Sequence, residues 1–375
     1  MSQSTNANEI VSGTHLWTGT LHLFIAFDWG DEIDLEKARK LVPAELHELR
    51  RRRRTPASIA YRPPPLRFPV AISSLALPEL HSPNALAEVT LFDFAAVSLA
   101  IHVPFQLAGD SLLRLAAWLA DSAPIVRYAC ASLKELHDQL LPTIDKPEWD
   151  RELSEEYFVF QFDAPAVTPL PDPLPQPLAN WLAGLLFLES EPLNPAVVKD
   201  ALHHRISYGP DDLLVPNWAA AVLFDRECDE TLQAIEFANL QLLEFRHIDL
   251  RLDGSLSAAY KILHPLVESR LPFWRSYSRP LRALGELKVE ANSLFERTEN
   301  VLKLVGDQYL ARVYRLLATR FHLEEWEQNI QRKLEVAEGV YQVVSDQADS
   351  YRTEVLEVIV IVLILLEIVL ALVRH

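Results

Sequence analysis

The distribution of proline constrains the fold of this chain more than any other feature. All 25 prolines lie at or before Pro280, and residues 281–375 contain none. Proline removes a helical hydrogen bond and clashes with the preceding turn, so a long segment without proline permits uninterrupted helices. We therefore expect a mixed region rich in turns, followed by a region of long helices.

Apolar residues in the proline-free region repeat in steps of three and four, which is the spacing of a coiled-coil seam. The second of two such series predicts one helix from about Glu324 to Val373, roughly 75 Å long at the helical rise per residue. The first series comprises Leu284, Leu287, Ala291, Leu294, Thr298, Val301 and Val305, and the second comprises Trp326, Ile330, Leu334, Ala337, Tyr341, Val344, Ala348, Tyr351 and Val355.

The last part of this predicted helix, Val355 to Val373, is apolar except for Glu357 and Glu367. Its length of roughly 28 Å is close to the hydrocarbon thickness of a bilayer. Glu357 lies at the entering edge and Glu367 about two turns from the far end, where the cost of a charged group is lower. The pattern predicts a transmembrane helix over 355–373, and the competing interpretation is a buried helix of a soluble protein.

The sequence before the helices predicts an α+β region. Alternating residues predict strands at 20–29 and 155–163 and two short strands within 87–105. Helical spacing begins after the capping residue Asp34 and again near Asp110. Six prolines within 164–177 indicate an extended linker, after which 194–206 is expected to be helical and 218–225 a strand.

These elements predict an α+β N-terminal region followed by long, coiled-coil-like α-helices and one C-terminal transmembrane helix. The expected parts are a disordered N-terminus (1–18), an α+β region (19–163), the Pro-rich linker (164–177), a second α+β portion (178–227), a helical region (228–354) and the membrane helix (355–373).

Charge and cysteine content exclude several classes of protein. The formal net charge of -17 argues against broad nucleic-acid binding, which needs basic surface. Cys130 and Cys228 are too few and too far apart for a disulfide framework or a Cys-x-x-Cys metal site. No phosphate-binding loop, dinucleotide fingerprint or nucleophile elbow occurs, so we expect no cofactor, no metal and no catalytic residues.

Three segments, RISYGPDDLLVPNWAAAVLFD (205–225), EFANLQLLEFRHIDLRLD (236–253) and the apolar terminus, resemble the Rmd/YagE family over roughly residues 15 to 375. The resemblance implies an anchored architecture and brings no catalytic residues. Because the first eighteen residues contain no Arg or Lys, a mitochondrial presequence is not expected. The expected location is therefore a bacterial inner membrane, with the bulk of the chain in the cytoplasm.

The most concentrated group of polar residues lies in the second of these segments. On a helix, Asp249 and Asp253 share a face, and His247 precedes Arg251 by one turn. The group could contribute to a metal site, or it could form ion pairs with neighbouring helices. Its members are Glu244, Arg246, His247, Asp249, Arg251 and Asp253.

Two other groups invite a functional interpretation. Five successive arginines, Arg50, Arg51, Arg52, Arg53 and Arg54, could contact anionic lipid, RNA phosphate or an acidic protein partner, or could form a solvated loop. His203, His204, Asp211 and Asp212 could act in acid–base chemistry, although Gly209-Pro210-Asp211 is also typical of a turn.

Three functions from different classes follow. The first is a non-enzymatic, tail-anchored membrane scaffold that self-associates through its C-terminal helices, with Glu357 and Glu367 as candidate membrane or oligomer residues. The second is an oligomeric ion channel or transporter with a layout like that of the CorA channels, in which Glu367 lines water. The third is a membrane-associated enzyme that uses the histidines and aspartates at 203–212.

Overall fold

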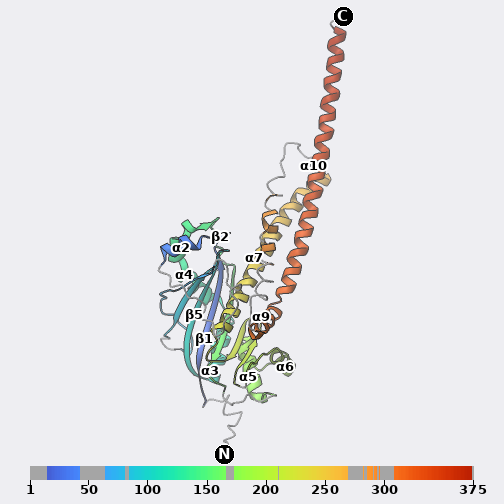
Figure 1. The fold of residues 1–375 in the computed structure, drawn as a ribbon. Coiled ribbons are helices and arrows are strands. Elements are labelled where there is room, and N and C mark those ends of the chain that lie inside the picture. Colours follow the sequence, from blue (N-terminus) through green and yellow to red (C-terminus); the bar gives the residue numbers. More distant parts are fainter. Residues whose placement is uncertain are drawn as a thin grey trace, which may run out of the picture. The chain divides into compact units, whose positions relative to one another are not determined.

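The fold is described from a computed structural model, which covers residues 15–42, 64–80, 84–165, 173–209, 211–268, 282, 285–289, 291–293, 295 and 308–373 (Figure 1). Contacts divide the chain into two compact units. The first comprises residues 1–244 and 298–324, and the second comprises 245–297 and 325–375. Each unit is described by itself.

A seven-stranded mixed sheet forms the centre of the first unit, with the strand order β3-β4-β5-β1-β7-β9-β8. Neighbouring strands are antiparallel except for β7 and β9, which are parallel. The two longest strands, β1 (Leu16–Asp28) and β5 (Ala96–Ala108), pair along their whole length. The others are β3 (Leu66–Pro69), β4 (Leu86–Leu91), β7 (Ser154–Phe162), β8 (Leu213–Pro216) and β9 (Ala220–Phe224).

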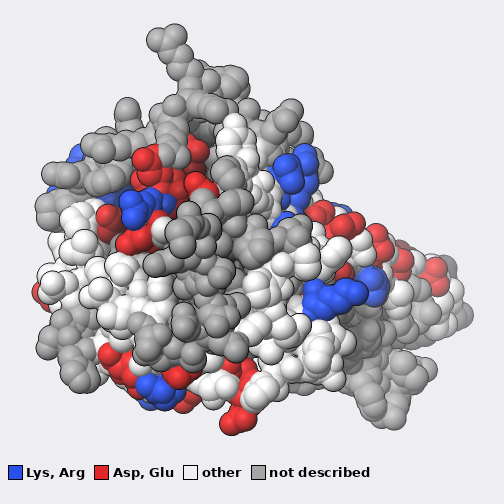
Figure 2. Space-filling view, turned by 90° about the horizontal axis from the view of Figure 1, so that it is seen from below, with Lys and Arg blue, Asp and Glu red and all other residues white. Residues whose placement is uncertain are grey.

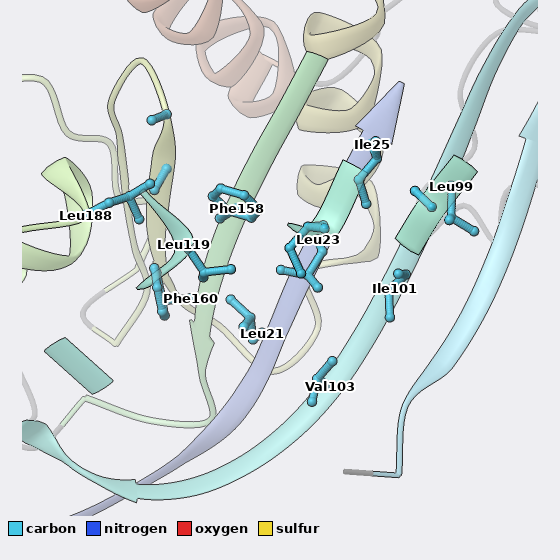
Figure 3. Packing of buried hydrophobic residues seen from close by; sticks show 14 of the residues in the cluster. Leu21, Leu23, Ile25, Leu99, Ile101, Val103, Leu119, Phe158, Phe160 and Leu188 are labelled. Atoms are coloured by element: carbon cyan, nitrogen blue, oxygen red, sulfur yellow. The ribbon is translucent and has the colours of Figure 1, made fainter. Parts of the chain in front are cut away.

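One face of this sheet carries the main hydrophobic core. Successive side chains of a strand point to opposite faces, so alternate residues share one side. Figure 3 shows this alternation for Leu21, Leu23 and Ile25 on β1, which lie beside Phe158 and Phe160 of β7. In the same core, Trp17 of β1 stacks on Trp181 with ring centroids 4.6 Å apart, and the indole N–H of Trp181 donates to the carbonyl of Gly109 at 3.0 Å.

Helices cover this core. They are α3 (Gly109–Leu119), α4 (Ala123–Leu140), α5 (Gln176–Phe187) and α6 (Pro195–His203). The short helix α2 (Leu35–Leu41) is capped by the carboxylate of Asp34, which accepts a hydrogen bond from the Lys37 N–H. A two-stranded ladder of β2 (Glu32–Ile33) and β6 (Ile144–Asp145) lies at its start, and a 3-10 turn, η2 (Leu141–Thr143), precedes β6.

The opposite face of the sheet is covered by the beginning of α7 (Asp229–Glu268) and by α9 (Gln308–Arg320). Leu240 and Leu243 of α7 pack on Ala26 and Ala96 in a small apolar cluster. Tyr314 of α9 is buried and donates a hydrogen bond to the side-chain oxygen of Gln241. Both faces of the sheet are therefore buried within the first unit.

The second unit is built from the later part of α7, the described residues between 282 and 295, and α10 (Leu323–Val373). The first half of α10 contributes a buried stripe of Ile330, Leu334, Ala337 and Tyr341. Two polar contacts accompany this packing. Lys288 contacts Glu338 at 2.6 Å, and the Tyr341 hydroxyl donates a hydrogen bond to the carbonyl of Ser255 at 3.3 Å.

Several sequence predictions are confirmed by these elements. The strands at 20–29, 87–105 and 155–163, the cap at Asp34 and the continuous helix from about 324 to 373 all appear. The sequence analysis did not identify α4 or α5. In addition, β1 begins at Leu16, inside the segment expected to be disordered, and residues 166–172 of the Pro-rich linker lie outside the described residues.

The predicted transmembrane helix is wrong. Among the residues that the structure describes, no helix combines the length and the apolar character needed to cross a bilayer. The fold class is corrected to a mixed sheet with helices, and the predicted single-pass anchor and inner-membrane location are withdrawn with it.

Candidate functional site

The apolar end of α10 is the largest exposed apolar surface among the described residues. Its thirteen Leu, Ile and Val side chains between Leu356 and Leu370 are each 48% to 62% exposed. Glu357 and Glu367 lie in the same stretch and are also exposed. We call residues 356–370 the distal segment of α10. A helix that is apolar on all sides is normally covered by other protein or lipid, which makes this segment a candidate interaction site.

Helical geometry gives the distal segment two different sides. The buried stripe at Ile330, Leu334, Ala337 and Tyr341 alternates steps of four and three residues. Counting on with the same alternation leads to Val358, Val362, Leu365 and Val369, which we call the distal seam. At about 100° per residue, Glu367 lies about 170° around the helix from the centre of the distal seam, and Glu357 about 110°. Both glutamates therefore lie outside the distal seam, which contains only apolar side chains.

Two members of the predicted polar group on α7 form ion pairs with α10. Lys333 of α10 contacts both Asp249 and Asp253 at 2.7 Å. The pKa of Lys333 is raised, because its bonds to the two carboxylates outweigh the opposing effect of burial. Glu244 is buried in the first unit, and Arg246, His247 and Arg251 are half-buried in the second.

A row of buried polar side chains on the sheet was not identified from the sequence. His22 of β1 and His102 of β5 face each other in register, with their Nδ1 atoms 2.7 Å apart. The Nε2 of His22 lies 2.9 Å from the side-chain oxygen of Gln161, whose amide nitrogen donates to the carbonyl of Asp225 at 2.8 Å. Because that oxygen only accepts, His22 carries its proton on Nε2 and receives a hydrogen bond at Nδ1 from His102.

Burial keeps both rings neutral. It lowers the pKa of His22 to about 3, with the neighbouring His102 acting in the same direction. It also lowers the pKa of His102 to about 4, with the positive charge of Arg67 as the second cause. A general base works best with a pKa near the working pH, so this pair is suited to fixing strands rather than to proton transfer at pH 7. The signal in the sequence was a single histidine within each of two mostly apolar strands.

An ion pair between a half-buried arginine and a buried glutamate continues the row towards the sheet edge. Arg67 of β3 donates to the carboxylate of Glu236 on α7, and its Nε donates to the hydroxyl of Thr90 at 3.0 Å. The Thr90 hydroxyl in turn lies 3.2 Å from the other oxygen of Glu236. One turn later, the amide of Asn239 donates to the carbonyl of Glu155 at 3.0 Å. These bonds fix the start of α7 on the sheet.

The histidines and aspartates near 203–212 lie at the end of α6 and in the turn that follows it. The rings of His203 and His204 are 5.5 Å apart at the end of α6, and the Nδ1 of His204 lies 3.2 Å from the carbonyl of Asp200. The carboxylate of Asp212 accepts the Tyr208 N–H at 2.8 Å and the Gly209 N–H, so it closes a turn. Asp211 lies beside that turn, and Pro210 is outside the described residues.

The structure says less about the predicted basic run and about metal binding. Arg50 to Arg54 lie outside the described residues, so the basic run stays a prediction. Within the described ranges, no group of three or more His, Cys, Asp or Glu side chains is placed to hold a metal ion. The face shown in Figure 2 carries patches of both charge signs separated by uncharged surface, rather than one continuous basic area.

Comparison with known proteins finds one family over the sheet and its helices. Residues 18–230 match the family described as "Uncharacterized protein MJ0711, N-terminal domain". The chain is also 28% identical to "Uncharacterized protein MJ0711" of Methanocaldococcus jannaschii over 243 residues, which is 64% of this chain and 73% of that protein.

No solved structure matches the chain. The comparisons do not link it to the Rmd/YagE family, so that expectation is not supported. The matched range begins in β1 and ends in the first turn of α7, so it spans more than half of the chain. The chain therefore belongs to the family of the MJ0711 N-terminal domain.

Proposed function

We propose that this chain is a self-associating scaffold whose copies join through the distal segment of α10. The observation that carries the proposal is the exposure of its thirteen apolar side chains, each at 48% to 62%. Burial of apolar surface stabilises a protein by roughly 25 cal/mol per Å². A helix whose apolar surface stays in contact with water does not gain this stabilisation. The scaffold acts by holding together copies of the first unit, which contains the seven-stranded sheet and which we call the sheet unit. It performs no chemistry of its own.

A second copy of the same helix is the occupant that fits this surface best. The distal seam continues the spacing by which the first half of α10 already packs. Leu365 and the valines at 358, 362 and 369 give an apolar seam with no charge, while Glu357 and Glu367 lie away from it. Two or more such helices in parallel would bury their seams against one another and keep every glutamate on the outer surface.

The cost of burying a charged group favours the same arrangement. Burying a carboxylate without a partner costs several kcal/mol, so a packed face is expected to avoid both glutamates. The distal seam is the side of the helix that does so. Symmetric self-association also needs only one surface that is complementary to itself, which a repeating apolar seam provides.

A matched pair of substitutions tests the proposal. Val362 lies within the distal seam and is 54% exposed, whereas Val360 lies on the opposite side of the same helix and is 52% exposed. Val362→Lys places a charge in the seam and is expected to weaken self-association at least tenfold. Val360→Lys adds the same charge outside it and is expected to leave association unchanged. Size-exclusion chromatography with light scattering, over a range of protein concentrations, measures both effects.

Two outcomes would contradict the proposal. Equal loss of association in both variants would show that added charge, rather than seam position, controls assembly. A wild-type protein that stays monomeric in buffer and binds lipid vesicles instead would assign a different occupant to the distal segment.

A further inference from the structure

The distal segment of α10 has more apolar surface than its seam contains. Of the thirteen exposed Leu, Ile and Val side chains between Leu356 and Leu370, the distal seam includes four. The other nine are also 48% to 62% exposed. An assembly that covered only the distal seam would therefore leave most of these side chains in contact with water.

A heptad register locates the side chains next to the distal seam. The alternation of three and four residues assigns the seam to positions a (Val362, Val369) and d (Val358, Leu365) of a heptad written a to g. Positions e and g flank such a seam. The flanking residues are Ile359 and Leu366 at e and Ile361 and Ile368 at g. Two-stranded coiled coils often carry Glu or Lys at e and g, whereas here all four residues are apolar.

The flanking residues widen the apolar surface on both sides of the seam. At about 100° per residue, they lie about 70–90° from the seam centre, with e on one side and g on the other. Both glutamates and the remaining five apolar residues of the distal segment lie about 110° or more from that centre. The apolar face therefore extends well to either side of the seam, and the charges lie behind it.

We propose that each distal segment packs between two neighbouring copies, in a parallel bundle of three or more helices; this inference rests on the self-association proposed above. A two-stranded coiled coil has one contact, which buries mainly positions a and d. In a closed ring, each helix contacts one neighbour on either side. The g side of one copy then meets the e side of the next, and all four flanking residues become buried.

The distal seam alone would favour a different number of helices. Valine at position a with leucine at position d favours two strands, and Val362, Leu365 and Val369 follow this rule. The flanking residues favour a larger assembly, because a dimer would leave two apolar edges along its whole distal segment. Soluble proteins rarely leave contiguous apolar surface of that kind in water. The width of the apolar face therefore outweighs the composition of the seam.

Sedimentation equilibrium of the chain, residues 1–375, tests the proposal. At high protein concentration, the mass is expected to level off at three or more times the chain mass of 42.6 kDa. The variant Ile361→Glu with Leu366→Lys places opposite charges at g and at the next e. In a parallel dimer these positions pair at the edge of the contact, whereas a larger bundle buries them. The limiting mass of this variant is therefore expected to fall to twice the chain mass.

A matched control adds the same two charges away from the flanks. Val360→Glu with Ile364→Lys places them four residues apart on the side of the helix that carries the glutamates, and is expected to leave the mass unchanged. An unmodified chain whose mass levels off at twice the chain mass would overturn the bundle and leave self-association intact. A chain that stays monomeric would contradict the proposed function itself. Equal masses for the unmodified chain and the flank variant would also overturn the bundle, because the flanks would then not be buried.

Discussion

The sheet unit and the distal segment of α10 use similar side chains in opposite ways. In the sheet unit, both faces are covered from within the chain, and residues such as Leu23 and Phe160 have no exposed surface. In the distal segment, leucine, isoleucine and valine stand about half exposed. Apolar composition alone therefore does not say what covers a surface. Helices of the same unit cover the sheet, whereas under our proposal another copy of the chain covers the distal segment.

The largest expected loss of stability comes from a substitution in the sheet core, which we compare with a substitution in the distal segment. Phe160→Ala opens a cavity in the sheet core and is expected to cost about 3–5 kcal/mol of stability. Leu363→Ala removes a side chain that is 59% exposed and lies outside the distal seam, so its cost is expected to stay within about 0.5 kcal/mol. Thermal unfolding followed by circular dichroism compares the two. Similar losses would show that the distal segment is packed like the core.

The ion pair between Arg67 and Glu236 provides the next largest effect. The side chain of Glu236 is 4% exposed and that of Arg67 is 21% exposed, so Glu236→Ala leaves a half-buried guanidinium without its carboxylate and is expected to cost about 2 kcal/mol. The double variant Arg67→Met with Glu236→Met removes both charges and is expected to recover most of this loss. Chemical unfolding measures all three proteins. A double variant no more stable than the single one would contradict the role given to unpaired charge.

The histidine pair predicts how the sheet unit responds to acid. The folded protein keeps His22 and His102 neutral, with pKa values of about 3 and about 4, whereas unfolded histidine has a pKa near 6.5. The two neutral rings make their full contribution to the stability of the folded protein above about pH 6.5. Below it the unfolded chain takes up protons first, so stability falls by up to about 1.4 kcal/mol per pH unit for each ring.

Melting temperatures between pH 7 and pH 4.5 check this prediction. His22→Asn is expected to reduce the slope of stability against pH, because one buried titrating group is lost. Equal slopes in the wild type and His22→Asn would contradict the burial of a neutral ring.

The smallest effect belongs to the second unit. Lys333→Met removes a cation that bridges Asp249 and Asp253, and its side chain is 28% exposed. Partial exposure weakens such pairs, so a loss of about 1 kcal/mol is expected. Lys288→Met, at a more exposed pair with Glu338, is expected to cost less. The reverse order would show that the two-carboxylate contact does not strengthen the packing of α10.

Regular local patterns in the sequence predicted much of this fold. Alternation identified β1 and β7, Asp34 identified the start of α2, and the absence of proline identified the length of α10. Features that depend on distant partners were not predicted. Nothing near His22 indicates that His102 lies opposite, 80 residues later, and nothing near Glu236 indicates Arg67. The membrane prediction failed because apolar character was taken to identify the covering medium.

Sedimentation equilibrium of the unmodified chain, residues 1–375, in aqueous buffer tests the central claim most directly. The monomer mass is 42.6 kDa. We predict an average mass that rises with protein concentration towards a whole multiple of this value. A mass that stays at 42.6 kDa across the micromolar range would contradict self-association through α10.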